Sequence, residues 1–256
     1  YVLEKRSPGY SVYFGKDNFI DISDKPEEII ETFEKIEPGS GKHLKDFMKK
    51  AKANYEIAMQ DLVYNPGKSV LELVSVETAK RLPLFVQNIS ETVRRNIKNP
   101  KLRSILEFPV LFLGAKPNNT PAFYNFMNHA DFGMGTWYPK GGFNAVAKGM
   151  QQLAEELGVK FMVNEEVTEI FTEDNDAKSV ITKNGVFEAD IVISGADYAH
   201  TETLLKSTEQ NYTSEYWQKK TFAPSSFLYY VAFDKKVPQL QHHNLFFDTD
   251  FEQHAE

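Results

Sequence analysis

Apolar residues recur every three or four positions from His43 to Leu62, a spacing that predicts one amphipathic helix. A proline- and glycine-rich break at 38–41 separates this helix from a shorter one before it. Asp24 is the expected N-cap of the shorter helix, and Pro26 suits its first turn. The apolar stripe of the longer helix consists of Leu44, Phe47, Met48, Ala51, Tyr55, Ala58, Met59 and Leu62.

The helical pattern continues through residues 66–107, and Pro100 interrupts it. Its apolar positions include Leu84, Phe85, Ile89, Val93 and Ile97. The next stretch, 108–127, is the most apolar of the chain, but it is no single span because prolines and a glycine break it. It could wall a hydrophobic tunnel or belong to an ordinary core. The breaks are at Pro109, Gly114, Pro117 and Pro121.

Strand patterns flank this helical region. Residues 1–24 contain three short strand-like runs, YVLEKR, YSVYF and FIDIS, which turns separate. Residues 225–236 alternate weakly between apolar and polar positions, which indicates another strand. A break at Pro238 and the run HHNLFFDTD follow.

A helix and several strands are predicted between 143 and 197. The helix carries an apolar stripe that starts at Phe143, and Gly158 is placed to end it. VKFMV and EVTEIFTE are strand-like, and a hairpin is expected to turn through Asn184-Gly185 with type I′ geometry. The second half of that hairpin, ADIVIS, reads as a buried strand that ends in a small-residue turn. This order predicts an α/β domain, in which ligands bind at strand ends.

Composition narrows the class of protein. The 256 residues are 41% hydrophobic and 25% charged, as in globular proteins, and 20 Phe and 12 Tyr supply material for an apolar pocket. The absence of cysteine excludes disulfides and thiolate catalysis, and it fits a cytoplasmic setting. The net charge of −7 argues against nucleic-acid binding. No apolar run approaches the roughly 20 residues of a membrane span.

The chain lacks the common catalytic and metal-binding motifs. The six histidines lack metal-ligand spacing, so no metal site is predicted. His242 and His243 are expected to point in opposite directions along a strand. The chain has no nucleophile elbow. It also lacks a glycine-rich phosphate loop, because Tyr138 stands where the third glycine after Gly133 and Gly135 would belong.

Several segments resemble one family in collinear order. The run FPVLFLGAKPNNTPAFYNFMNHADFGMGTWYPKGGFNAVAKGMQQLAEELG is similar to bacterial and archaeal phytoene desaturases of carotenoid biosynthesis. SPGYSVYFGKDNFIDIS, PEEIIETFEKIEPGSGKHLKDFM, EADIVISGADYAHTETLL and SSFLYYVAFDKKVPQLQHHNLFF match further family segments. The most specific parts are Trp137 to Gly142 and the His242-His243-Asn244 run. The family's N-terminal dinucleotide loop and C-terminal flavin segment have no counterpart, so the chain looks like the middle of a longer protein.

The resemblance implies a mixed α/β fold, part of an FAD-binding, amine-oxidase-like (GR2-type) architecture. Residues 1–24 would be substrate-domain strands and 25–130 a helical region facing substrate and membrane. Residues 131–200 would return to the FAD-binding domain, with the helix from Phe143 packed on its sheet, and 201–256 would supply more substrate-domain strands. This chain alone is not expected to hold FAD tightly.

The resemblance also implies site residues. The implied cofactor is FAD, with Val167, Ser194, Gly195, Ala196 and Asp197 as its contacts. The implied substrate-cavity residues are Trp137, Tyr138, Pro139, Gly141 and Gly142. For the glycines and Asp197, ordinary turn chemistry stays an open alternative. No catalytic acid or base is implied.

The implied reaction is FAD-dependent desaturation of phytoene, in which a CH–CH unit becomes C=C. Alternatives within the family are another carotenoid desaturase, an isomerase, an oxidase or a retinol-saturase-like enzyme. An alternative of another class is a flavin-free domain that binds apolar ligands or a partner. The partner would be an apolar polyene, delivered from a membrane surface to which the protein binds peripherally. The lysine-rich stretch 42–52 suits such a surface, or is simply a solvated helix face.

Overall fold

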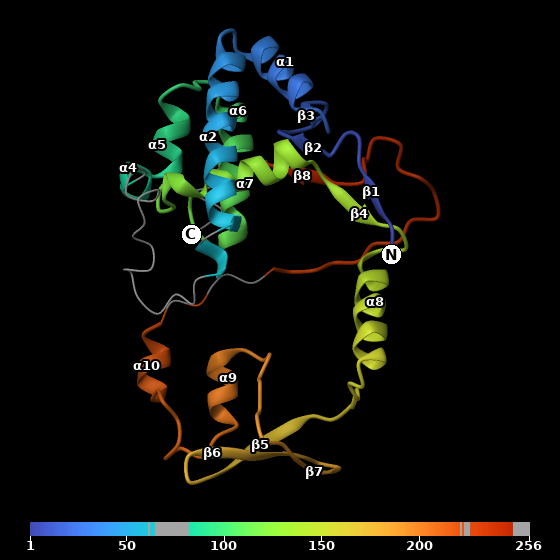
Figure 1. The fold of residues 1–256 in the computed structure, drawn as a ribbon. Coiled ribbons are helices and arrows are strands. Elements are labelled where there is room, and N and C mark those ends of the chain that lie inside the picture. Colours follow the sequence, from blue (N-terminus) through green and yellow to red (C-terminus); the bar gives the residue numbers. More distant parts are fainter. Residues whose placement is uncertain (61, 65–81, 221, 223–225, 248–256) are drawn as a thin grey trace. The chain divides into compact units, whose positions relative to one another are not determined.

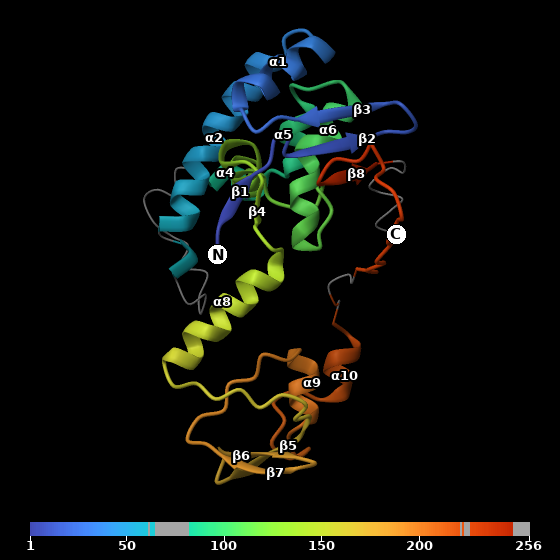
Figure 2. The ribbon, with the colours of Figure 1, turned by 90° about the vertical axis from the view of Figure 1, so that its right-hand side faces the viewer.

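The computed structural model of the chain describes residues 1–60, 62–64, 82–220, 222 and 226–247. They form two compact units, one of the described residues within 1–148 and 227–247 and one of those within 149–226. Each unit has its own sheet and helices, labelled in Figures 1 and 2. The part of the predicted helical region between 65 and 81 lies outside the described residues.

Short strands of the first unit come from widely separated parts of the chain. The strand β2 (Tyr10–Tyr13) lies at the centre of a sheet, antiparallel to β3 (Phe19–Ile22) and parallel to β8 (Asn244–Phe246). A separate ribbon pairs β1 (Leu3–Lys5) antiparallel with β4 (Trp137–Pro139). The three strands predicted before residue 24 are therefore confirmed, and the last part of the unit's chain returns beside the first (Figure 2).

Helices make up the rest of the first unit. The two predicted helices are present as α1 (Pro26–Ile36) and α2 (Ser40–Gln60). Short helices follow, and among the described residues no helix is long and apolar enough to cross a membrane. They are η1 (Leu62–Tyr64), α4 (Leu82–Val86), α5 (Ile89–Arg94), α6 (Pro100–Glu107), η3 (Phe108–Leu113), η4 (Ala122–Asn125), α7 (Phe126–Asn128) and the π-helical turn η5 (His129–Gly133).

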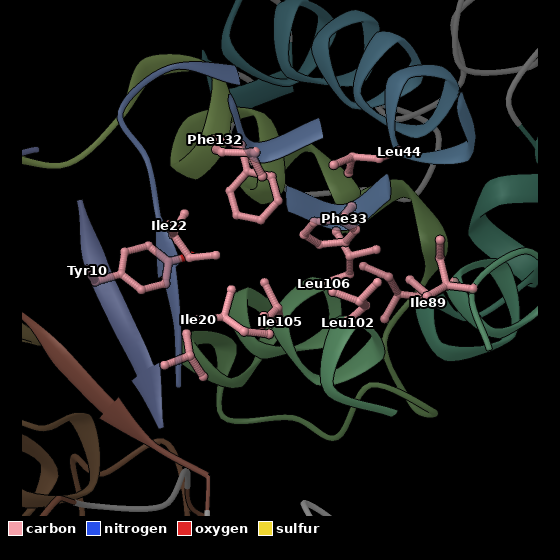
Figure 3. Close-up of a cluster of buried hydrophobic side chains, with 14 of the residues drawn as sticks. Tyr10, Ile20, Ile22, Phe33, Leu44, Ile89, Leu102, Ile105, Leu106 and Phe132 are labelled. Atoms are coloured by element: carbon pink, nitrogen blue, oxygen red, sulfur yellow. The ribbon is translucent and has the colours of Figure 1, made fainter. Parts of the chain in front are cut away.

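A single hydrophobic core joins the sheet and the helices of this unit. Figure 3 shows strand residues such as Ile20 and Ile22 gathered with helix residues such as Leu102 and Ile105. Phe33 of α1 is fully buried and meets Phe132 edge-on, with 6.4 Å between the ring centroids. The stripe of α2 faces this core through Leu44 and Ala51, while Met59 near its end is exposed. Because α2 has its apolar side packed, the amphipathic pattern is explained by the protein interior.

The start of α1 differs from the sequence prediction. The N-cap of α1 is Lys25, and no side chain caps the helix. The Asp24 carboxylate instead accepts a hydrogen bond from Ser7 Oγ at 2.6 Å and lies 3.7 Å from Lys5 Nζ. Asp24 is thus not the cap, because tertiary partners from β1 and its loop occupy its side chain.

The helical spacing of residues 84–97 does not produce one helix. The helix α4 ends at Val86, and Asn88 then caps α5 by accepting a hydrogen bond from the Glu91 amide at 2.8 Å. Asn88 also forms an isolated antiparallel β-bridge with Pro121. The side chain of Asn88 competes with helix continuation, which is the usual effect of asparagine. Pro100 starts α6 and does not merely interrupt a helix.

The second unit contains a three-stranded antiparallel sheet and two short helices. The sheet has the order β5 (Val167–Glu173), β6 (Asp176–Thr182) and β7 (Gly185–Glu188). The short helices are α9 (Tyr198–Thr203) and α10 (Ser214–Gln218), and the residues between them are irregular. The helix α8 (Phe143–Glu156) crosses the boundary between the two units.

Several apolar runs do not form the predicted strands. VKFMV, ADIVIS and the run after Ser226 are irregular, and Ile193 and Phe227 are each 89% exposed. The stripe of α8 is exposed as well, so the expected packing of this helix on a sheet is absent from the described residues. A buried-type strand needs neighbours for its backbone and both faces, and the described residues place none beside these runs.

The hairpin between β6 and β7 is confirmed, but its turn is different. Thr182 pairs with Gly185, so the turn residues are Lys183 and Asn184, and neither has a positive φ. Glu165 holds this turn by accepting hydrogen bonds from Thr182 Oγ1 and Asn184 Nδ2. The positive φ values that a type I′ turn requires occur instead at Asp174 and Asn175, between β5 and β6.

Candidate functional site

A largely apolar cavity of about 530 Å³ lies between the sheet and the helices of the first unit. Its volume is within the range of small-molecule sites, roughly 300–1,000 Å³. The wall comes mainly from β2, α2, η3, the adjoining turns α7 and η5, and β8, so the fold assembles it from five separate segments of the chain. The lining residues are Tyr10, Tyr55, Met59, Phe108, Pro109, Phe112, Phe126, Met127, Ala130, Asp131, Thr136, His243 and Leu245.

The stretch 108–127 contributes five residues to this cavity, while other residues of the same stretch are core. Phe108 and Phe112 meet edge-on at 5.1 Å between ring centroids, and Phe112 is 74% exposed. Pro109 also lines the cavity and Val110 is fully buried. This stretch therefore contributes to both the cavity wall and the core, and the hydrophobic tunnel stays a prediction.

One carboxyl group faces this apolar lining. Tyr10 Oη donates a hydrogen bond of 2.6 Å to Asp131 Oδ2, and both residues line the cavity. Burial raises the pKa of Asp131 to about 6, and the hydrogen bond from Tyr10 opposes that rise. Burial and the neighbouring Asp131 charge raise the pKa of Tyr10 well above its usual value. A carboxyl group with a raised pKa in an apolar cavity is a candidate acid or base.

A rare backbone conformation presents Asp131. It lies in the π-helical turn η5, and such turns are frequent at functional sites. Its neighbour Phe132 is 2% exposed and packs on Phe33 in the core. The core therefore anchors the turn on one side while the carboxyl group faces the cavity on the other.

A cluster of aromatic and basic side chains surrounds Tyr138. Its ring meets the His242 ring at 4.3 Å between centroids and the Arg6 guanidinium at 5.5 Å. His242 Nδ1 and His243 Nδ1 are 3.2 Å apart, so the prediction that they point in opposite directions is wrong. They precede β8 and are not in a strand. Burial, His243 and Arg6 lower the pKa of His242.

The predicted substrate-cavity residues lie beside this cluster. Trp137, Tyr138 and Pro139 form β4, and the indole nitrogen of Trp137 donates to the Met134 carbonyl at 2.9 Å. Gly141 and Gly142 follow with φ values of 87° and 79°, which favour glycine. None of the five lines the 530 Å³ cavity, whose nearest wall residue in sequence is Thr136.

The predicted cofactor contacts lie in the second unit. Val167 is the first residue of β5 and pairs with Thr182. Asp197 caps α9 by accepting from the His200 amide at 3.2 Å, and Ser194 Oγ lies 2.7 Å from Thr201 Oγ1. Turn chemistry thus accounts for the polar side chains of Ser194 and Asp197. Ser194, Gly195, Ala196 and Asp197 are all exposed.

No group of three or more potential ligands that could hold a metal ion occurs within the described ranges. The paired histidines, His242 and His243, have no third ligand among those residues.

Comparison with known proteins gives the class. The profile of the family described as flavin containing amine oxidoreductase matches residues 15–251. The chain therefore belongs to this family of flavin-dependent oxidoreductases, and its implied cofactor is FAD. The mixture of helices and strands agrees with the predicted amine-oxidase-like fold class.

Particular relatives are similar over nearly the whole chain. The carotenoid 3,4-desaturase of Haloarcula japonica is 35% identical over 258 residues, covering 99% of this chain and 52% of that protein. The zeta-carotene-forming phytoene desaturase of Myxococcus xanthus is 26% identical over 252 residues, covering 97% and 48%. A solved oxidoreductase structure from Methanosarcina mazei is 20% identical, with a TM-score of 0.49 and coverage of 85% and 46%. The chain thus spans about half the length of the relatives it matches.

The second unit offers part of a fit to a dinucleotide. In the described part of the chain, the backbone groups of residues 191–195 make no hydrogen bonds to other backbone groups. A Cβ placed on Gly195 would meet no atom within 4 Å, so the backbone there is open to a ligand. Exposed backbone beside small side chains can accept the edge of a nucleotide. Ser194, Gly195 and Ala196 fit that use, but they supply no positive charge for a pyrophosphate.

Sequence reasoning missed the pair formed by Tyr10 and Asp131. The two residues are 121 positions apart, and neither belongs to a recognisable motif. The available signal was an aspartate within the apolar and aromatic surroundings of residues 122–138. That signal is weak because abundant carboxylates occur elsewhere in the chain.

Proposed function

We propose that the full-length protein is an FAD-dependent desaturase of an apolar polyene and that phytoene is its substrate. The observation that carries the proposal is the apolar cavity of about 530 Å³ in a chain of the flavin-containing amine oxidoreductase family. Both named desaturases above act, by their names, on phytoene or a carotenoid. A hydrocarbon has no polar handle, so a cavity walled by aromatic and aliphatic side chains is the recognition chemistry it requires.

The residues of the cavity would bind and orient the polyene. The rings of Phe108, Phe112 and Phe126 supply apolar contact, which is worth roughly 25 cal/mol per Å² of buried surface. The same rings exclude water from the reacting carbons. FAD, when bound, supplies the oxidation itself by accepting a hydride.

A carotenoid that is already conjugated is the second candidate substrate. The observation that favours it is the 35% identity to a carotenoid 3,4-desaturase, higher than the 26% identity to the phytoene desaturase from Myxococcus xanthus. The fold and cofactor would be the same for both substrates. Only the fit of the polyene in the cavity separates them.

We further propose that Val167, Ser194, Gly195, Ala196 and Asp197 contact FAD. Their support is the exposed small-residue turn and its free backbone groups. Gly195→Val in the full-length protein should weaken FAD binding because the added side chain blocks close approach of the ligand. Flavin content of the purified protein measures this, with Gly185→Val in the β6–β7 turn as a matched control.

Trp137, Tyr138, Pro139, Gly141 and Gly142 remain proposed substrate-side residues, at an extension of the cavity beyond Thr136. The division into substrate strands (1–24 and 201–256), helical region (25–130) and FAD-domain return (131–200) remains a proposal as well. Tyr138→Ala should change the preferred polyene length more than it changes FAD content. Equal FAD content with unchanged substrate preference would contradict the assignment.

Peripheral membrane binding is proposed at the mouth of the cavity. Met59 and Phe112 line the cavity and are 43% and 74% exposed, while Val63 and Tyr64 of η1 follow α2 and are exposed too. The lysines of α2 are exposed and can meet anionic headgroups, although its apolar side is packed in the core. Flotation with anionic liposomes tests this, and a Phe112→Ser variant that floats as well as the wild type would refute this contact.

The deciding experiment uses the full-length protein with FAD and liposomes that contain either phytoene or a conjugated carotenoid. Chromatography with absorption spectra follows the products. Red-shifted polyene bands from phytoene would establish the proposed reaction, and conversion of only the conjugated carotenoid would establish the second candidate. Conversion of neither, by a protein with bound FAD, would refute both.

A further inference from the structure

We propose that Asp131, positioned by Tyr10, is the catalytic proton acceptor of this desaturation. The inference rests on the proposed function, because it assigns a role within the same cavity. Among the described residues that line the cavity, Asp131 contributes the only carboxyl group. A proton that leaves carbon inside an apolar cavity needs such an acceptor, since the phenylalanine, methionine and leucine side chains of the wall cannot take a proton.

The geometry directs the carboxyl group to the cavity. One carboxylate oxygen, Oδ2, accepts the 2.6 Å hydrogen bond from Tyr10 Oη. No hydrogen bond to the other oxygen, Oδ1, occurs among the described residues, so it is available to a ligand. Tyr10 itself is only 6% exposed and packs against Phe108 at 6.4 Å between ring centroids. The tyrosine therefore holds the carboxyl group from the core side.

The titratable groups around Asp131 favour a carboxyl group that changes charge near neutral pH. Tyr10 from β2, Tyr55 from α2 and His243 before β8 share the cavity with it, and no lysine or arginine is among the described residues of the wall. Burial raises the pKa of Asp131 to about 6, and no cationic neighbour lowers it. A base with such a pKa is mostly ionised at pH 7 and still has useful affinity for a proton.

The proposed step balances as follows. FAD, when bound, would supply the oxidation by taking hydrogen with its electron pair, as hydride, from one carbon of the CH–CH unit. The adjacent C–H bond breaks, its proton forms an O–H bond with Asp131, and its electron pair becomes the second bond of C=C. The polyene would thus be oxidised by two electrons, and bound FAD would be the oxidant. The Asp131 carboxyl group must then release its proton before the next turnover.

The first test compares variants of the full-length, FAD-loaded protein. Asp131→Asn should lower kcat about 10²- to 10⁴-fold, the usual contribution of a general base, with polyene binding retained. Asp131→Glu should recover part of that loss. Asp234→Asn is the matched control, because Asp234 is exposed and outside the cavity, and it should be unchanged. Wild-type kcat in Asp131→Asn would overturn the assignment and leave the proposed function standing.

The pH profile separates a chemical role from a structural one. Activity of the wild type should rise with pH as Asp131 ionises, with a midpoint near 6. Tyr10→Phe removes a hydrogen bond that lowers the pKa of Asp131, so this acidic limb should move to higher pH. A limb that Asp131→Asn and Tyr10→Phe both leave in place would also overturn the assignment.

A readout without turnover keeps the test independent of the reaction. Infrared titration of the flavin-free protein should show a protonated-carboxyl band that Asp131→Asn removes. Adding polyene should move its midpoint to higher pH, because the ligand excludes remaining water. A midpoint that polyene does not move would overturn the proposal whether or not the enzyme is active. A moved midpoint in a protein that converts no polyene would support Asp131 as a ligand-facing base and refute the proposed function alone.

Discussion

The two units of this chain differ in how much apolar surface each buries. The first unit holds the whole hydrophobic cluster, including Phe33, Leu44 and Leu102. In the second unit, Ile170 is the sole hydrophobic side chain counted as buried among the described residues. Both units have regular strands and helices, so the contrast is one of packing and not of secondary structure.

Two helices with similar sequence patterns make the contrast concrete. Leu44 and Ala51 on the stripe of α2 are at most 1% exposed, whereas Met150 and Leu153 on the stripe of α8 are 67% and 57% exposed. An amphipathic stripe indicates that a helix packs against an apolar partner, but it does not identify that partner. The sheet and neighbouring helices of the first unit supply one for α2.

The largest effect is expected at the centre of the first unit. Phe33→Ala should lower the free energy of unfolding by about 3–5 kcal/mol, because it leaves a cavity in a packed core. Phe227→Ala is the control at an 89% exposed ring, where a change within about 0.5 kcal/mol is expected. Urea denaturation of both variants measures the difference. Equal losses would break the contrast between packed and unpacked aromatic residues.

A smaller effect should appear at the cavity of the same unit and depend on pH. The pKa of Asp131 is raised to about 6, so its protonated form stabilises the fold below about pH 4, and this stability is lost as pH rises through 6. Asp131→Asn keeps a neutral group at all pH values. It should therefore be more stable than the wild type by about 1–3 kcal/mol at pH 7 and similar to it at pH 4.

Thermal unfolding at the two pH values checks this prediction. Asp234→Asn serves again as the control, with no pH-dependent gain expected at an exposed site. A loss of stability in Asp131→Asn at pH 7 would show that the charged carboxylate is a structural element of the first unit.

The second unit should respond mainly to changes in its turns. Asn175 has φ of 66°, so Asn175→Val should destabilise the β5–β6 hairpin by about 1–2 kcal/mol. Asn175→Gly tolerates this backbone conformation and is the control. Hydrogen exchange of the amides of β5 and β6 reports the change. If valine left the exchange unchanged, the hairpin would have to turn in another way in solution.

The smallest effect is expected on the exposed face of α8. Leu153→Ala should change the free energy of unfolding of this chain by no more than about 0.5 kcal/mol, because little buried surface is lost. Chemical denaturation beside Phe33→Ala provides the comparison. A loss above about 2 kcal/mol would show that this face is covered in solution, and the contrast between α2 and α8 would end.

Local features of the fold were largely predictable. Pro26, the break at 38–41 and the stripe from Leu44 gave α1 and α2, and the alternation of YSVY and FIDI gave β2 and β3. Such features depend on neighbours in sequence, where propensity and period are sufficient signals. VKFMV and ADIVIS have the apolar pattern of strands but are irregular, because they lack neighbouring strands among the described residues.

The apolar character of the site was predictable from the sequence, but the arrangement of its side chains was not. Aromatic abundance and the segment 108–127 indicated an apolar wall, and the resemblance to desaturases indicated a polyene for it. The prediction that His242 and His243 diverge was wrong because they lie ahead of β8, where the backbone turns both rings to one side.

The sequence by itself determined the family, the helix and strand periods, and which helices need an apolar partner. Only the tertiary structure decided which apolar stripes are packed against a partner, and it brought Tyr10 Oη to within 2.6 Å of Asp131 Oδ2. The physical reason is the distance along the sequence between the residues that interact. Helical and strand periods are set by residues a few positions apart, whereas a buried carboxyl group acquires its pKa from desolvation and hydrogen bonds that segments 121 residues apart create together.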